Sequence, residues 1–153
     1  FYFPGEFIGL EAPHMPSYQS TAVALEASSV CALPYKKVQA LGESMPRLQS
    51  QLLTRLSKEL AGDKTFMLLL GKKTSEEKLA TYLLSLSKRF EHRGFSAKEF
   101  SLTMSRSDIA NHLGLAVETI SRVFTKFQEN GLIVIDGKAI TLANINKIQA
   151  LCG

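Results

Sequence analysis

The sequence has little of several features that would assign it to a common class of protein. Its 153 residues include only two Cys, Cys31 and Cys152, which are too few for a disulfide framework, so we expect free thiols and a reducing cytoplasm. No apolar run reaches the roughly 20 residues that a membrane-spanning helix needs, so no membrane partner is expected. The start, Phe1-Tyr2-Phe3, lacks an initiator Met and the basic region of a signal peptide, and we expect a piece of a larger domain.

Motifs of catalysis are also missing. The three His residues, His14, His92 and His112, have no triad or metal-ligand spacing to acids or Cys. Gly94-Phe95-Ser96 and Pro4-Gly5-Glu6 fall short of a nucleophile elbow or a phosphate loop. The sequence therefore predicts a protein that is not an enzyme.

Positive charge is absent from the first 35 residues. All 18 Lys and Arg residues lie from Lys36 onward with 11 of the 14 acidic residues, so this part carries a net charge of +7. A basic segment joined to an acidic one favours a polyanion-binding module attached to something else. Ordinary surface charge is the alternative.

Short apolar runs and turn residues in the first 35 positions predict β structure. Pro4-Gly5 marks a turn, and residues 21–34 have the composition of two strands or one bent strand ending at Pro34. A short helix is expected over residues 35–41.

A long helix is expected next, with Ser44 as its N-cap and Pro46 in its first turn. Apolar residues recur along one face at steps of three, four or seven, a pattern typical of a dimerisation helix. Asp63, beside Gly62, interrupts this face, and in a parallel homodimer it would lie against its own copy. The alternatives are burial of the face within its own domain, and an Asp63 that turns outward at a helix irregularity. The predicted dimer-interface residues are Leu48, Leu52, Leu56, Leu60, Asp63, Met67 and Leu70.

Two capping boxes predict the helices that follow. Thr74-Ser-Glu-Glu77 opens an amphipathic helix, which a turn at residues 93–96 and a short strand at 100–104 follow. Ser105-Arg-Ser-Asp108 opens a second helix, which Gly114 ends. An amphipathic helix over residues 117–130 begins three positions later and is closed by Gly131. This spacing is typical of a helix-turn-helix.

A hairpin is predicted directly after the helix-turn-helix. Apolar strands over residues 132–135 and 138–142 flank Asp136-Gly137, which is typical of a two-residue type I′ turn. A helix-turn-helix followed by such a wing predicts binding to double-stranded DNA. A winged-helix module that contacts proteins instead is the alternative.

The exposed face of the second helix of the motif suits base recognition. Glu118 can accept a hydrogen bond from cytosine, Arg122 can make a bidentate contact to guanine, and Ser121 lies between them. Glu118 and Arg122, four positions apart, could instead form a surface salt bridge. The residues expected to contact phosphates beside this face are Ser105, Arg106, Thr119 and Lys126.

From residues 4–6 through Leu151, the sequence resembles the Crp/Fnr family of transcription regulators, and most closely its oxygen-responsive FNR/ANR branch. The motifs that carry the resemblance are residues 114–115 and 117–122 (Val-Glu-Thr-Ile-Ser-Arg), Arg89-Phe90, Arg93-Gly94-Phe95-Ser96, residues 68–73 (Leu-Leu-Leu-Gly-Lys-Lys) and Gly62-Asp63.

The resemblance implies an α+β fold in three parts. Residues 1–43 would be the end of a β-roll sensor domain of the cyclic-nucleotide-binding type, 44–72 the dimerisation helix, and 73–153 the winged helix-turn-helix domain. It implies a dimeric, cytoplasmic regulator of anaerobic gene expression that works with RNA polymerase. Glu118, Ser121 and Arg122 fall on the base-contacting positions, and Val117 can contact a thymine methyl, which together imply a palindrome of TTGAT-like half-sites.

The resemblance also implies a cofactor. The branch holds an oxygen-labile [4Fe–4S] cluster on four Cys, and Cys31 in Val30-Cys-Ala-Leu-Pro34 matches the context of the fourth, whereas the bare sequence favours a core Cys. The other three precede this stretch, so we expect no stable cluster in this chain alone. Two departures stand out: Ala116 replaces a capping Ser or Thr, and residues 18–20 lack the phosphate-binding Arg of the cyclic-nucleotide sensors. A haem-bound gas or a nucleotide remains an alternative signal.

Overall fold

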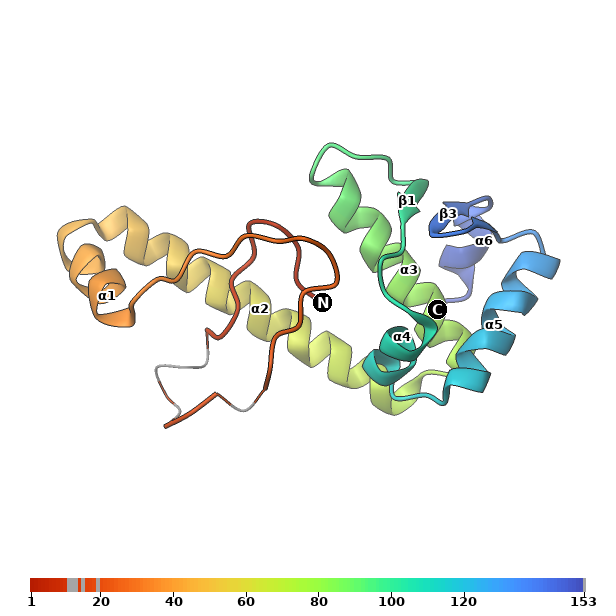
Figure 1. Ribbon diagram of the computed structural model, residues 1–153, viewed down its shortest axis with the longest axis horizontal. Helices are drawn as coiled ribbons and strands as arrows, with labels where there is room; N and C mark the ends of the chain where they lie inside the picture. The colour runs from red at the N-terminus through yellow and green to blue at the C-terminus, as the bar shows by residue number, and fades with distance from the viewer. Residues whose placement is uncertain (11–13, 15, 19, 153) are drawn as a thin grey trace. The chain divides into compact units, whose positions relative to one another are not determined.

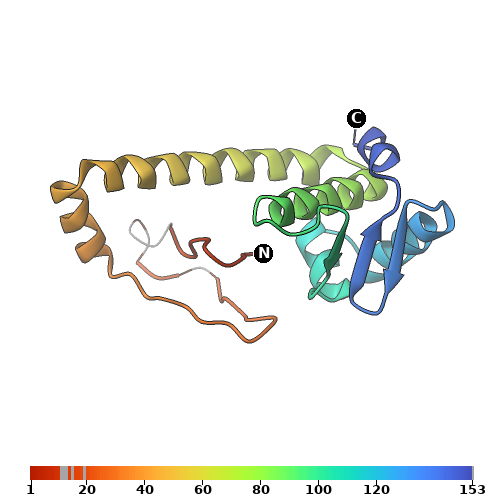
Figure 2. The same cartoon turned by 90° about the horizontal axis from the view of Figure 1, so that it is seen from above.

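The computed structural model describes residues 1–10, 14, 16–18 and 20–152 (Figure 1). The chain divides into two compact units, Phe1–Lys64 and Thr65–Gly153. Helix α2 is continuous across the boundary between them (Figure 2). The helices are α1 (Tyr35–Ser44), α2 (Pro46–Lys72), α3 (Ser75–Glu91), α4 (Arg106–Leu113), α5 (Val117–Glu129) and α6 (Ile145–Ala150). The strands are β1 (Glu99–Ser101), β2 (Ile133–Asp136) and β3 (Ala139–Leu142).

The strands expected in the first 35 residues are not present among the described ones. Residues 21–34 are extended or bent without pairing, and the prediction of β structure there is wrong for this chain. A strand exists only where a neighbour satisfies its backbone N–H and C=O groups. The described part of residues 1–34 contains no such neighbour for this segment.

Pro46 fixes the junction between α1 and α2. Met45 adopts a non-helical conformation (φ −130°, ψ 83°), as expected for a residue that precedes Pro, so α1 ends at Ser44 and α2 begins at Pro46. The expected N-cap role of Ser44 is wrong. Its Oγ instead donates to the carbonyls of Ala40 and Leu41 at the end of α1. The short helix expected at 35–41 is confirmed and is three residues longer.

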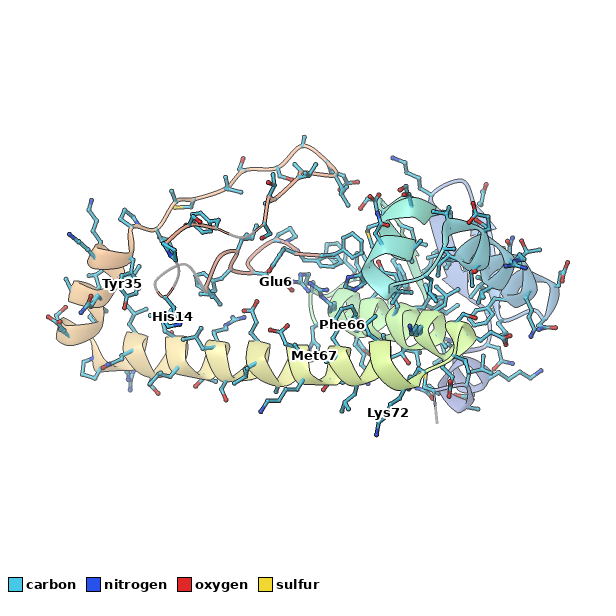
Figure 3. All side chains as sticks on the ribbon, turned by 90° about the horizontal axis from the view of Figure 1, so that it is seen from below. Glu6, His14, Tyr35, Phe66, Met67 and Lys72 are labelled. Atoms are coloured by element: carbon cyan, nitrogen blue, oxygen red, sulfur yellow. The ribbon has the colours of Figure 1, made fainter. Side chains whose placement is uncertain are left out.

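Several apolar side chains of α2 are open to solvent. The exposed fractions of Leu56, Leu60 and Met67 are 42%, 59% and 70% (Figure 3 shows Met67). Asp63 is also exposed, and α2 continues without a break through Gly62 and Asp63, so the helix irregularity considered for this site does not occur. Leu48, Leu52 and Leu70 are half-buried. Among the described residues, no helix is both long enough and apolar enough to cross a membrane.

Both predicted capping boxes are confirmed. Thr74 accepts from the Glu77 amide, while the Glu77 carboxylate accepts from the Thr74 amide. The same two-way arrangement joins Ser105 and Asp108 at the start of α4. These hydrogen bonds hold the pKa of each carboxyl, Glu77 and Asp108, below its usual value. The caps therefore fix where α3 and α4 begin.

The wing is a three-stranded antiparallel sheet in the order β1-β3-β2. Asp136 pairs with Ala139, so the two loop residues are Gly137 and Lys138, one position later than expected. Only Gly137 of these two has a positive φ, 56°, whereas a type I′ turn requires positive φ at both central residues. The predicted hairpin is confirmed, and the predicted turn type is wrong.

Helix α6 was not expected from the sequence. Asn144 caps it by accepting from the Lys147 amide at 3.0 Å, and Ile148 is buried. The core of unit 65–153 lies between α3, α4, α5 and the sheet. Its fully buried large side chains are Phe124, Phe127, Leu79, Leu83, Leu86, Ile109, Leu113, Ile120, Ile133, Ile140, Leu142 and Ile148.

Candidate nucleic-acid interface

Helices α4 and α5 form the predicted helix-turn-helix. Gly114 ends α4 in the left-handed conformation (φ 61°, ψ 44°), which a residue without a Cβ adopts at no steric cost. The Leu115 amide donates to the Ala110 carbonyl at 2.9 Å and closes the turn. Two residues later α5 begins at Val117. The turn therefore has the tight geometry that the sequence predicted.

A buried cation joins α3 to this turn. Lys78 is 8% exposed, and its Nζ donates to the Leu113 carbonyl at the end of α4 at 3.3 Å. A positive charge at a helix C-terminus is favourable because the last carbonyls carry partial negative charge. Sequence reasoning missed this contact, although Lys78 lies next to Leu79 and one turn before Tyr82 on the apolar face of α3.

The predicted base-contacting residues share one exposed face of α5. Val117, Glu118, Ser121 and Arg122 are all exposed, while Ile120, Val123, Phe124 and Phe127 on the opposite face are buried. In the described part of the chain, Glu118 and Arg122 form no ion pair with each other. Both side chains are thus open to a partner.

The start of α5 departs from a capped helix in the way the sequence predicts. Ala116 occupies the N-cap position, and no side chain accepts from the first amides. Such a loss costs about 1 kcal/mol relative to a Ser or Thr cap. Glu118 in the first turn offsets part of that cost through the helix dipole.

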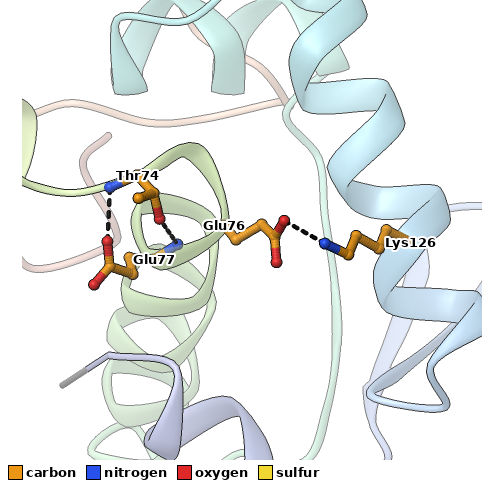
Figure 4. Close-up of polar contacts among 4 residues, drawn as sticks. All are labelled: Thr74, Glu76, Glu77 and Lys126. Carbon is orange, nitrogen blue, oxygen red and sulfur yellow. Dashed lines mark hydrogen bonds and ion pairs between the residues drawn. The ribbon is translucent and has the colours of Figure 1, made fainter.

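The residues predicted to contact phosphates have different environments. The Ser105 Oγ is engaged in the cap of α4, with Asp108 Oδ2 at 2.6 Å. The Arg106 guanidinium lies over the Phe124 ring at 3.4 Å from its centroid, and burial lowers the pKa of Arg106. Thr119 is half-buried on α5. The Lys126 Nζ lies 2.5 Å from a Glu76 carboxylate oxygen (Figure 4). The contacts of these four residues with phosphates stay predictions.

His112 on α4 is packed rather than available for chemistry. Its imidazole stacks on the Phe66 ring with centroids 4.5 Å apart, and the Tyr82 ring lies 5.5 Å away. Burial lowers the pKa of His112 to about 4, so the ring is neutral at physiological pH.

The two thiols lie in different units and have different surroundings. Cys31 is exposed in an extended segment. Cys152 is half-buried, and its Sγ lies 3.5 Å from the Thr81 Oγ1. Within residues 1–10, 14, 16–18 and 20–152, no three His, Cys, Asp or Glu side chains gather as a metal site would require. These residues by themselves therefore do not fit a cluster held by four thiolates.

Comparison with known proteins supports this interpretation of the site. Residues 77–151 match the Crp-like helix-turn-helix domain family. The chain is 48% identical to the transcriptional activator protein Anr of Pseudomonas aeruginosa and 44% identical to the fumarate and nitrate reduction regulatory protein of Salmonella typhimurium, over its full 153 residues. It spans 63% and 61% of those proteins.

The fold has a matching solved relative. FixK2 from Bradyrhizobium japonicum superimposes with a TM-score of 0.71 at 30% identity, over 77% of this chain and 58% of that one. The names of the two relatives by sequence are those of regulators and not of enzymes, in agreement with the prediction that this chain is not an enzyme. The motif, the sequence identities and the superposition together show that residues 77–151 form a Crp-like helix-turn-helix domain and that the chain is similar along its full length to Anr- and Fnr-like regulators.

Proposed function

We propose that this chain is the DNA-binding and dimerising part of a transcription activator that controls anaerobic gene expression. The observation that carries the proposal is the exposed face of α5, where Val117, Glu118, Ser121 and Arg122 stand together above a buried apolar face. The name of the Pseudomonas aeruginosa relative, a transcriptional activator protein, supports activation as the outcome. RNA polymerase is the partner that an activator requires, and the cytoplasm is its place of action.

The proposed readout follows from the chemistry of these four side chains. The Arg122 guanidinium donates to guanine O6 and N7, Glu118 accepts from cytosine N4, and Val117 contacts a thymine methyl. The proposed site is a palindrome of TTGAT-like half-sites, with the two recognition helices roughly 34 Å apart in a dimer. Ser105, Arg106, Thr119 and Lys126 would hold the register on the phosphates.

Arg122→Ala tests the proposed function. We expect it to weaken binding to a TTGAT palindrome by about 1–3 kcal/mol, because a bidentate base contact is lost, and to leave binding to scrambled DNA nearly unchanged. Fluorescence anisotropy with both duplexes at fixed salt measures the two affinities. Lys147→Ala, which removes the same charge from α6, is the matched control. An equal loss on both duplexes would remove Arg122 from the readout.

We propose that the apolar face of α2 forms the homodimer interface. Leu48, Leu52, Leu56, Leu60, Met67 and Leu70 supply its apolar surface, and the exposure of Leu56, Leu60 and Met67 supports this. We retain the division into residues 1–43, the end of the sensor domain, 44–72, the dimerisation helix, and 73–153, the DNA-binding domain. The boundary at Lys64 and Thr65 falls inside the proposed dimerisation helix.

We propose that oxygen is the signal and that Cys31 is one of four thiolate ligands to a [4Fe–4S] cluster in the intact protein. The exposure of Cys31 supports this role, because an exposed thiol is accessible to a cluster whose other ligands lie elsewhere in the intact protein. The cluster supplies the reactivity toward oxygen. The chain's own contribution is to place one thiolate four positions before the start of α1, since Ala32, Leu33 and Pro34 separate Cys31 from Tyr35.

Cys31→Ser tests the ligand role. In the full-length protein purified without oxygen, we expect the variant to lose most of its bound iron and sulfide, because a cluster lacking one thiolate is labile. Iron and acid-labile sulfide are measured per protomer, with Cys152→Ser as the matched control that removes the other thiol of this chain. Unchanged iron and sulfide in Cys31→Ser would show that Cys31 is not a ligand.

A further inference from the structure

Two adjacent acids in the first turn of α3 have separate roles. Glu77 is committed to the capping box, with its carboxylate 2.7 Å from the Thr74 amide. Glu76 points the other way and reaches Lys126 on α5, fifty positions along the chain (Figure 4). The capping of α3 therefore leaves the Glu76 carboxylate available for a contact with the recognition helix.

Lys126 lies beside the proposed base-reading face. It is one helical turn after Arg122 and two turns after Glu118, so its side chain emerges on the same side of α5. Its Nζ lies 2.5 Å from Glu76 Oε1. In the free protein, this cation is thus already paired with an acid of the same chain.

The ion pair contributes little to holding the fold. The side chains of Lys126 and Glu76 are 54% and 36% exposed, and exposed pairs are screened by water and salt. The ion pair has a larger effect on the binding of a polyanion, because a phosphate that approaches Lys126 must replace the Glu76 carboxylate or bind beside it. Replacement breaks the pair, and binding beside it brings two negative charges together.

We propose that Glu76 restrains the affinity of this protein for the DNA backbone by competing with phosphate for Lys126. The inference rests on the proposed function and adds to it a residue outside the helix-turn-helix. Because a phosphate carries no sequence information, the restraint acts equally on the target site and on unrelated DNA. It lowers the amount of protein that unrelated DNA retains and leaves discrimination to the base contacts.

The test is E76Q, which keeps the shape of the side chain and removes its charge. We expect E76Q to tighten binding to both a TTGAT palindrome and a scrambled duplex by the same factor, about two- to five-fold at low salt, as the loss of an exposed ion pair predicts. In the K126A background the same substitution is expected to change affinity much less. E91Q, which removes a carboxylate from the end of α3, is the matched control and is expected to have the same small effect in both backgrounds.

Three results would overturn the inference. E76Q could tighten binding equally with and without Lys126, which would show direct repulsion alone. It could leave affinity unchanged, or it could weaken binding, which would show that the ion pair positions Lys126 for DNA. The parent protein's preference for the palindrome over the scrambled duplex tests the proposed function in the same titrations. A protein that shows no preference but obeys the Glu76–Lys126 coupling would refute the sequence readout and retain the restraint.

Discussion

Phe124→Ala is expected to lower the free energy of unfolding of unit 65–153 by about 3–5 kcal/mol, because it leaves a large cavity in a packed core. Phe124 is 2% exposed and lies on the inner face of α5. The substitution also removes the ring on which the Arg106 guanidinium rests at 3.4 Å. One residue therefore links the core to a proposed phosphate contact.

Urea denaturation followed by circular dichroism measures the change. Val134→Ala is the matched control, since Val134 is 57% exposed on β2 and its truncation should cost less than about 1 kcal/mol. Phe124→Leu separates volume from stacking: it keeps an apolar side chain in the core and removes the ring beneath Arg106. If Phe124→Ala costs no more than Val134→Ala, the packing of α5 described above is wrong.

Asp63→Ala is expected to shift the full-length protein from monomer to dimer in air. In a parallel dimer, the exposed Asp63 side chains of the two copies would face each other among Leu60 and Met67. Two carboxylates about 6 Å apart at an effective dielectric of about 20 repel by roughly 3 kcal/mol, which is about a hundredfold in the dissociation constant. Removing that repulsion lets the apolar face associate without help from a bound cluster.

Sedimentation velocity in air over a range of protein concentrations reads out this change. Glu43→Ala, which removes a carboxylate from α1 instead of α2, is the control and should leave the parent's association unchanged. Asp63→Ala that stays as monomeric as the parent would show that Asp63 does not oppose dimerisation.

The parts of the fold that sequence predicts well are those fixed by local chemistry. The capping boxes at Thr74 and Ser105 and the left-handed Gly114 depend on side chains within four positions of one another, and each occurs as expected. Residues 21–34 have strand composition but form no strand, because a strand depends on a partner that composition does not supply. The hairpin turn shifted by one residue for a similar reason, since pairing across β2 and β3 sets the register.

In the candidate site too, features set by local sequence could be predicted and contacts between distant residues could not. The exposed face of α5 follows from helical periodicity, so the exposure of Glu118, Ser121 and Arg122 could be predicted from sequence. The partners of Arg106 and Lys126 could not, because Phe124 and Glu76 lie 18 and 50 positions away and become neighbours only through packing. Sequence spacing alone carries no signal for such contacts.

The packed imidazole of His112 makes the stability of the helix-turn-helix domain depend on pH. In the unfolded chain this His titrates near pH 6.5, whereas burial against Phe66 lowers its pKa in the folded state to about 4. Since the folded pKa is the lower one, the full stability is present above about pH 6.5, and part of it is lost as the pH falls toward 4, because only the unfolded state binds the proton readily. Unfolding in mild acid therefore takes up a proton at His112, so acidification destabilises α4, the first helix of the helix-turn-helix.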